Sequence, residues 1–251
     1  MGRERSLGCR RHPKGGRGKH EVAQIDAAID RAIKAKLARG RQNRRMRRPK
    51  QPIVFVGLPR GGSHLTGFLA FGPPYASLQF DHPQEFLLGF YAQMTHIYSP
   101  GTWTSTESAK LDGTLGGPYA TPSQDSVPIF TKWMLVFEQP DERILWLGRA
   151  APRVWMESGK HFGVSGAPTS FGIVRYQVTS DLAHDKVAAT VEMPADKAVI
   201  VKLRLRTPGR RTIHSVTVNG SNWSSFSQSD EAIDLPASSL HGTVQVAVVY
   251  E

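Results

Sequence analysis

The half of the chain from Arg143 to Glu251 is a series of short segments in which apolar and polar residues alternate. In the segment Ala198–Arg206, Val201 and Leu203 face one side, whereas Lys202, Arg204 and Arg206 face the other. A period of two residues is that of a β-strand with one buried face. Further segments of this kind are Arg143–Leu147, 161–165, 171–179, 186–193, 213–218, 231–235 and 242–250. Because turn residues separate them, the sequence predicts an all-β sandwich over residues 143–251.

A tight turn is predicted at Asn219-Gly220, because both residues tolerate a positive φ. Trp223, just after this turn, is expected to fold back over the hairpin as a lid on the core. The alternative is that Trp223 and the cationic side of Ala198–Arg206 form a carbohydrate-binding face, which needs an exposed aromatic ring.

Four short motifs carry a resemblance to a known family. They are Leu-Gly-Arg-Ala-x-Pro-Arg-x-Trp from Leu147 to Trp155, Ser-Gly-Lys at 158–160, Ala-Pro-Thr-x-Phe-Gly from Ala167 to Gly172 and Val-Thr-Val-Asn-Gly from Val216 to Gly220. In this order they resemble the C-terminal part of bacterial six-hairpin glycosidase-like proteins, in which an (α/α)6 toroid precedes a β-sandwich. The resemblance spans about residues 80–251. It implies an α+β chain, with a few N-terminal helices as the remnant of a toroid followed by the sandwich.

Two helical segments fit that remnant, which is expected over residues 51–142. Pro83 to Tyr98 carries apolar residues at helical spacing and has proline at its start. Pro128 to Phe137 is a second helix or a buried strand. Helices that have lost partners expose apolar surface, so self-association through them is possible.

The resemblance also implies where a sugar would bind. In toroid glycosidases the site is a cup lined by loops, with paired carboxylates and aromatic platforms, because one carboxyl protonates the leaving oxygen while the other activates water or attacks carbon. Glu107 beside Trp103 is the best candidate pair of carboxylate and platform. The other candidates are Asp81 and Asp125 as catalytic carboxylates and His82 as a substrate-binding residue. None has an identifiable partner, so the isolated chain is expected to have little or no glycosidase activity.

Residues 1–50 have a different character, because they hold 17 of the 32 Lys and Arg residues but 4 of the 21 Asp and Glu residues. This basic arm is predicted to be largely disordered, with one amphipathic helix at 21–39. Counterion release from phosphates could give it affinity for nucleic acid. It has no aromatic residue for stacking on bases, so nucleic acid is a possible but disfavoured partner.

A glycine-rich stretch offers a separate alternative. Pro52 to Gly57 suits a buried strand, and Arg60, Gly61, Gly62, Ser63 and His64 follow it. This stretch resembles the strand and phosphate-binding loop of sulfotransferases, where backbone N–H groups at a helix N-terminus hold a phosphate. Gly61 and His64 replace the usual Ser and Thr, and the later sequence lacks further βαβ units.

Other classes are excluded or unsupported by the sequence. One cysteine, Cys9, permits no intrachain disulfide, and the histidines lack metal-ligand spacing, so no metal and no cofactor are predicted. The chain has neither a secretory signal nor an apolar run long enough to span a membrane, which predicts no membrane partner and, by default, a cytoplasmic protein. The leading hypothesis is a fragment or shortened relative of a glycoside hydrolase that acts on carbohydrate and is inactive alone. The alternatives are a non-enzymatic β-sandwich interaction module and a phosphate-binding protein.

Overall fold

Three antiparallel or mixed β-sheets and a group of helices make up the computed structural model, which describes residues 60–61, 64–67, 70–99, 101–110 and 115–251. All of these residues belong to one compact unit that spans residues 52–251. The predicted basic arm at 1–50, its helix at 21–39 and the strand that begins at Pro52 lie outside the described residues.

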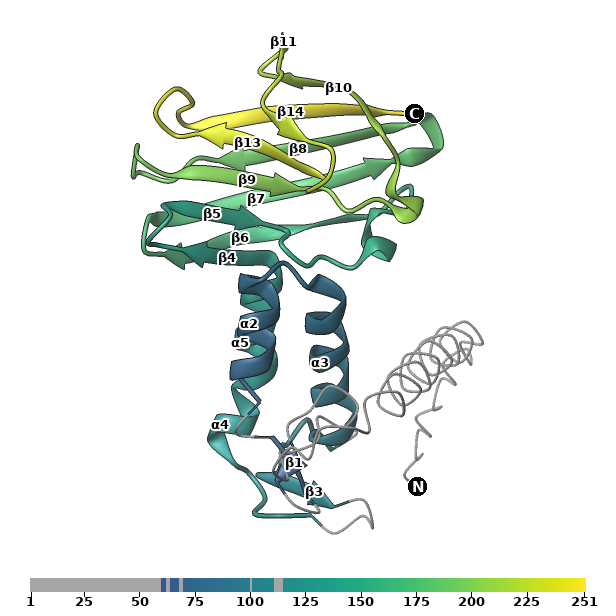
Figure 1. The fold of residues 1–251 in the computed structure, drawn as a ribbon, viewed down its shortest axis with the longest axis vertical. Helices are drawn as coiled ribbons and strands as arrows, with labels where there is room; N and C mark the ends of the chain where they lie inside the picture. The colour runs from purple at the N-terminus through teal and green to yellow at the C-terminus, as the bar shows by residue number, and fades with distance from the viewer. Residues whose placement is uncertain (1–59, 62–63, 68–69, 100, 111–114) are drawn as a thin grey trace, which may run out of the picture. The chain divides into compact units, whose positions relative to one another are not determined.

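The sandwich consists of two facing sheets (Figure 1). One sheet has six strands in the order β11-β10-β14-β8-β7-β6, and the other has five in the order β12-β13-β9-β5-β4. The strands of the first sheet are β6 (His161–Thr169), β7 (Gly172–Asp181), β8 (Lys186–Glu192), β10 (Ile213–Val218), β11 (Ser221–Asn222) and β14 (Thr243–Tyr250). Those of the second are β4 (Val136–Gln139), β5 (Ile144–Leu147), β9 (Ile200–Arg204), β12 (Phe226–Ser227) and β13 (Ala232–Pro236).

Alternation along the strands produces the core between the two sheets. In the β14–β8 pair, Val246 lies opposite Ala189 and Val248 opposite Val187, so buried side chains meet on the same face. On β7, Val174, Tyr176 and Val178 are buried, whereas the residues between them are exposed. Residues directly opposite in an antiparallel pair share a face, so the alternation of each strand is reinforced by its neighbours. The predicted α+β class with a β-rich C-terminal half is confirmed.

Helices precede the sandwich in the chain: α2 (Gly72–Gln79), α3 (Pro83–His96), α4 (Thr121–Gln124) and α5 (Ser126–Leu135). The predicted helix from Pro83 is confirmed, and it begins with proline in its first turn. The segment predicted as a helix or a strand is both, because α5 ends at Leu135 and the chain continues directly as β4. β4 pairs with β5, with Phe137 opposite Trp146. Short 3₁₀ turns occur at η1 (Arg153–Met156), η2 (Leu182–His184) and η3 (Pro208–Arg210).

A second apolar core joins the helices to the five-stranded sheet. Phe86 and Phe130 from α3 and α5 are fully buried in it, and Phe137 and Trp146 reach it from β4 and β5. In Figure 1, α2, α3 and α5 run side by side next to β4. The five-stranded sheet therefore has buried side chains on both faces. The boundary at residue 143 stays a prediction, although β4, which lies before it, is already part of the sandwich.

A small sheet of β1 (Arg60–Gly61), β2 (His64–Thr66) and β3 (Ser108–Lys110) lies at the end of the helices that is remote from the sandwich (Figure 1). Here we call residues 101–110 and 115–120 the tip. No described helix is long and apolar enough to cross a bilayer.

Candidate functional site

The tip is built on a short antiparallel ladder that positions Glu107. The Glu107 N–H donates to the Gly117 carbonyl at 2.9 Å, and the Gly116 N–H donates to Ser108 at 2.7 Å. Glu107 is exposed, and a side chain on Gly117 would start 3.5 Å from its Oε2. The absence of that side chain leaves space over the carboxylate. The predicted catalytic candidate therefore sits on an open, hydrogen-bonded surface.

Trp103, the predicted platform, is 55% exposed and has a φ of 53°. A left-handed backbone is rare for a bulky residue, so the surrounding structure must impose it. The Trp103 carbonyl accepts from Gln124 Nε2 at 2.7 Å, and its N–H donates to Ser99 at 3.1 Å. The Tyr98 ring packs edge-on at 6.2 Å between centroids. The indole is thus held in place and remains open to solvent on part of its surface.

Tyr119 is a second exposed aromatic residue in the tip that the sequence reasoning missed. It is 74% exposed and also left-handed, with a φ of 58°. Ala120, the next residue, is anchored to the segment that follows Trp103, because the Ser105 Oγ donates to the Ala120 carbonyl at 3.2 Å. An aromatic residue directly after Gly116-Gly117-Pro118 was the signal that could have found it, because such a turn leaves its neighbour little room to fold inward.

Gln124 connects the segments of Trp103 and Tyr119, because its backbone N–H donates to the Ala120 carbonyl at 2.9 Å and its side chain bonds the Trp103 segment. Its Oε1 accepts from the Ser105 N–H at 2.9 Å, while its Nε2 holds the Trp103 carbonyl. Beneath it, the Tyr98 hydroxyl donates to the Ser123 carbonyl at 2.9 Å. This network fixes the backbone under both rings. Asp125, predicted as a further carboxylate, is exposed at the start of α5, and its carbonyl accepts from Ile129 at 3.1 Å.

Asp81 lies outside the tip, at the turn between α2 and α3, where it meets the five-stranded sheet. Its carboxylate is ion-paired with Arg204, and Arg149 Nη2 lies 3.6 Å away. Burial alone raises the pKa of Asp81, but the Arg204 hydrogen bond and charge, followed by Arg149 and Arg206, bring it below its usual range. A general acid needs a raised pKa. The setting of Asp81 therefore suits a permanently charged ion pair.

The guanidinium groups around Asp81 are buried. Arg204 is 5% exposed and Arg206 2% exposed. Arg149 stacks over the Trp146 ring at 3.8 Å and donates to the Leu78 carbonyl at 2.8 Å. Burial lowers the pKa of Arg149 to about 10, which leaves it cationic at neutral pH. His82, next to Asp81, is exposed, and its backbone N–H donates to Ser77 at 2.6 Å.

The burial of Arg204 and Arg206 corrects one alternative that the sequence left open. A carbohydrate-binding face made of Trp223 with Lys202, Arg204 and Arg206 is wrong, because the two arginines are covered. Trp223 packs against the sandwich core and its indole donates to the Asp234 carbonyl at 3.0 Å, as predicted for a lid. The turn at Asn219-Gly220 is confirmed by φ values of 50° and 80°.

The predicted phosphate loop is also corrected. Arg60 lies opposite Leu65 and Gly61 opposite His64, so this stretch forms an antiparallel hairpin. A phosphate loop needs a helix N-terminus directly after the turn, to direct N–H groups at the anion. Here the turn is followed by β2, and α2 begins only at Gly72. Gly62 and Ser63 themselves lie outside the described residues. Among the residues that are described, no three His, Cys, Asp or Glu side chains are grouped to hold a metal.

No protein-family model and no curated protein sequence matches the chain. Among solved structures, it is similar to a protein described as a glycoside hydrolase, with a TM-score of 0.41, 12% identity and coverage of 75% of this chain and 33% of the other. It is also similar to Ara127N, a GH127 β-L-arabinofuranosidase from Geobacillus stearothermophilus T6, with a TM-score of 0.33, 12% identity and coverage of 68% and 28%. The chain thus spans at most a third of the length of either protein.

Proposed function

We propose that this chain binds carbohydrate through its tip and does not hydrolyse it, as the sandwich-bearing part of a glycoside-hydrolase-like protein. The observation that carries the proposal is the pair of exposed, left-handed aromatic residues Trp103 and Tyr119. The motif resemblance over residues 80–251 supports the choice of ligand class.

The backbone conformation and the exposure of these two rings both cost free energy. A bulky residue in a left-handed backbone costs about 1–3 kcal/mol, and an exposed aromatic ring leaves apolar surface in water. The hydrogen bonds that Gln124 donates to the Trp103 carbonyl and Ser105 to the Ala120 carbonyl hold the backbone in this conformation. One face of a pyranose ring presents C–H groups, so stacking on an indole or phenol ring removes apolar surface from water on both sides. Glu107, on the same ladder, can accept hydrogen bonds from sugar hydroxyls.

Binding without cleavage follows from the carboxylates. Hydrolysis needs two of them about 5 to 9.5 Å apart, one with a raised pKa. In the described part of the chain, the pKa values of Asp81, Glu138 and Asp196 lie below their usual range, which is the opposite direction to that of a general acid. Burial raises the pKa of Asp81 and Glu138, but hydrogen bonds from Arg204 and from Ser170, respectively, outweigh it. Asp196 accepts a hydrogen bond from the Ala198 N–H and pairs with Arg143. We assign Glu107 the role of a binding carboxylate that accepts hydrogen bonds from sugar hydroxyls.

Binding is tested by calorimetric titration of the protein with neutral linear hexasaccharides, namely cellohexaose, xylohexaose, maltohexaose and arabinohexaose. Trp103→Ala and Tyr119→Ala should each weaken binding about tenfold, which corresponds to about 1.4 kcal/mol. Phe80→Ala is the matched control, because Phe80 is an aromatic residue of similar exposure, 73%, outside the tip. Equal affinity in all four proteins would contradict the proposal.

Hydrolysis is tested on the same hexasaccharides and on aryl glycosides. No product should form with the wild-type chain. Turnover that disappears in Glu107→Gln would overturn the non-catalytic part of the proposal and make Glu107 a catalytic residue.

A further inference from the structure

The tip places a carboxylate beside its two exposed rings. Along the segment that begins with Trp103, Glu107 follows after four residues, which is at most about 14 Å of chain. On the neighbouring segment Gly117 lies opposite Glu107, because the Glu107 N–H donates to the Gly117 carbonyl at 2.9 Å. Tyr119 is two residues beyond Gly117, so its backbone lies within about 7 Å of the glycine that the Glu107 carboxylate covers.

Tyr119 is the extra residue of a β-bulge in this ladder. Thr106 pairs with Pro118, but the Ser105 carbonyl accepts from the Ala120 N–H at 3.3 Å, so two residues of one segment oppose one residue of the other. Bulges re-aim a side chain and are common next to active sites. The bulge accounts for the left-handed backbone of Tyr119, with a φ of 58°, and for a ring that stands out from the ladder.

The charge around these rings is negative. Described residues 101–110 and 115–125 include two carboxylates, Glu107 and Asp125, and one cation, Lys110. Lys110 is three residues beyond Glu107, and because side chains of a strand alternate between its faces, the two side chains leave the ladder on opposite sides. Within this part of the chain, the side that carries Glu107 therefore has a carboxylate without a cation next to it.

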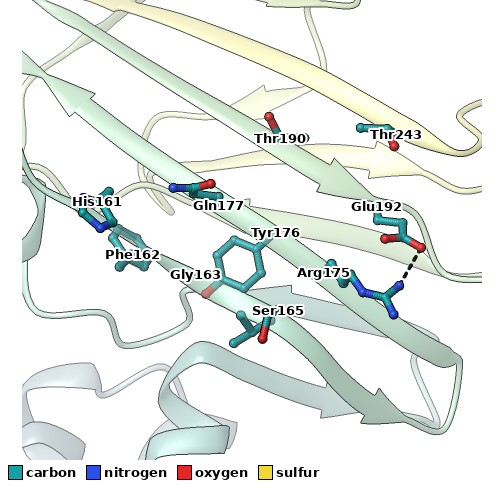
Figure 2. Close-up of a pocket in the computed structure, with 11 residues that line it drawn as sticks. His161, Phe162, Gly163, Ser165, Arg175, Tyr176, Gln177, Thr190, Glu192 and Thr243 are labelled. Atoms are coloured by element: carbon teal, nitrogen blue, oxygen red, sulfur yellow. Dashed lines mark hydrogen bonds and ion pairs between the residues drawn. The ribbon is translucent and has the colours of Figure 1, made fainter.

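The charges on the outer face of the six-stranded sheet are balanced instead. A cavity of about 470 Å³ opens on that face, and Figure 2 shows Arg175 and Glu192 beside it. Arg175 Nη1 lies 2.8 Å from Glu192 Oε1. An ionic ligand would find both of these charges already paired, whereas the tip offers the Glu107 carboxylate to a cation.

The two rings add to this preference for a cation. The face of an aromatic ring attracts an ammonium group, most strongly when the ring is an indole. Trp103 and Tyr119 are 55% and 74% exposed, so part of each ring is open to such a group. The chain as a whole carries a charge of +11 and repels cationic ligands at long range. A preference for a cationic sugar must therefore come from the local arrangement of the tip.

We propose that the tip selects oligosaccharides of protonated amino sugars over neutral ones, with Glu107 as the carboxylate that pairs with an ammonium group. The inference rests on the proposed carbohydrate binding at the tip and names the class of sugar that is bound there. Trp103 and Tyr119 stack on the C–H faces of the sugar rings, as in the proposed function. Glu107 supplies the charge that a neutral sugar does not use.

Three hexasaccharides with the same β-1,4-linked backbone test this selection: cationic hexaglucosamine, its neutral N-acetylated form chitohexaose, and neutral cellohexaose. Calorimetric titration at about pH 5.5, where the amino groups are protonated, should show hexaglucosamine binding at least fivefold more tightly than either neutral ligand. Glu107→Gln should abolish this preference and change cellohexaose binding little, because the glutamine amide still accepts hydrogen bonds from hydroxyls. Glu192→Gln is the matched control, since it removes the same charge from a half-exposed carboxylate outside the tip and should leave the preference unchanged.

The outcomes separate this inference from the proposed function. Equal affinity of the wild-type chain for all three ligands overturns the selection of amino sugars and leaves carbohydrate binding at the tip. A preference for hexaglucosamine that persists in Glu107→Gln or in Trp103→Ala overturns the selection as well, because the ammonium groups would then be bound elsewhere. Equal loss of the preference in Glu192→Gln contradicts the role of Glu107. Absence of binding to these three ligands and to the other neutral hexasaccharides overturns both the inference and the proposed function.

Discussion

Both faces of β9 carry buried residues, and the chemistry of the two faces is opposite. On the inner face, Val201 and Leu203 pack into the sandwich core, where the neighbours are apolar. On the outer face, Arg204 is 5% exposed, and just beyond the strand Arg206 is 2% exposed. The inner face needs only close packing, whereas a buried guanidinium needs acceptors and a counter-charge. Asp81 supplies that charge to Arg204, so the burial of Arg204 depends on a side chain from the α2–α3 turn.

The largest loss of stability is expected from a substitution on the inner face of β9. Leu203→Ala removes a fully buried side chain from the core between the two sheets. The lost burial and the resulting cavity should reduce the free energy of unfolding by about 2–5 kcal/mol. Urea denaturation followed by circular dichroism measures this. A loss below about 1 kcal/mol would show that the sandwich core adapts to the cavity.

Asp81→Asn tests the outer face. It leaves Arg204 buried without its counter-charge and should cost roughly 2–3 kcal/mol, less than the about 3–5 kcal/mol of a fully buried pair because Asp81 is 41% exposed. Asp196→Asn is the matched control, since its partner Arg143 is exposed. Because solvent screens that exposed pair, Asp196→Asn should destabilise the protein much less than Asp81→Asn does. Equal losses of unfolding free energy in the two variants would show that the Asp81 ion pair contributes no more to stability than an exposed pair.

The pH dependence of the same variant gives a second test. The pKa of Asp81 is lower in the folded chain than its usual value, although burial opposes this, because Arg204 favours the ionised form. The unfolded chain therefore takes up this proton first as the pH falls, near its unperturbed pKa of about 3.9. The stability difference between wild type and Asp81→Asn should be constant from pH 8 to 6 and shrink below about pH 4. A difference that grows in acid would contradict the ion pair.

The smallest expected effect concerns the tip. Tyr119→Gly removes the strain of a left-handed tyrosine, worth about 1–3 kcal/mol, at a cost of about 0.5–1 kcal/mol in backbone entropy. The melting temperature should stay the same or rise by a few degrees, while hexasaccharide binding weakens. A large drop in melting temperature would show that Tyr119 is a packing residue instead.

Much of the sandwich could be predicted because its strands have one clear apolar side. The alternation in β7 and β14 agrees with the tertiary environment, so the local pattern was sufficient. β4 was predicted only as one of two options, because the mostly apolar run Pro128–Phe137 fits a helix as well as a strand, and nothing local shows where α5 ends. The pairing of Val136 and Phe137 with β5 makes this end of the segment a strand.

The candidate site could be predicted less completely, because long-range contacts define it. Arg204 looks like a solvent-facing residue of a strand, and its burial depends on Asp81, 123 residues earlier in the chain. Glu107 and Trp103 were found through an acidic and an aromatic residue close together in a loop. Tyr119 was missed because its exposure results from the backbone at Gly117 and Pro118 rather than from its own residue type.

The most direct test of carbohydrate binding uses the tryptophan indole N–H signals in a ¹⁵N-labelled protein. All five tryptophans of the chain are described: Trp103 in the tip, and Trp133, Trp146, Trp155 and Trp223 elsewhere. Titration with the four neutral hexasaccharides should shift the Trp103 signal and leave the other four nearly unchanged. Shifts confined to Trp133, Trp146 or Trp223, or no shift of any signal at saturating oligosaccharide, would contradict carbohydrate binding at the tip.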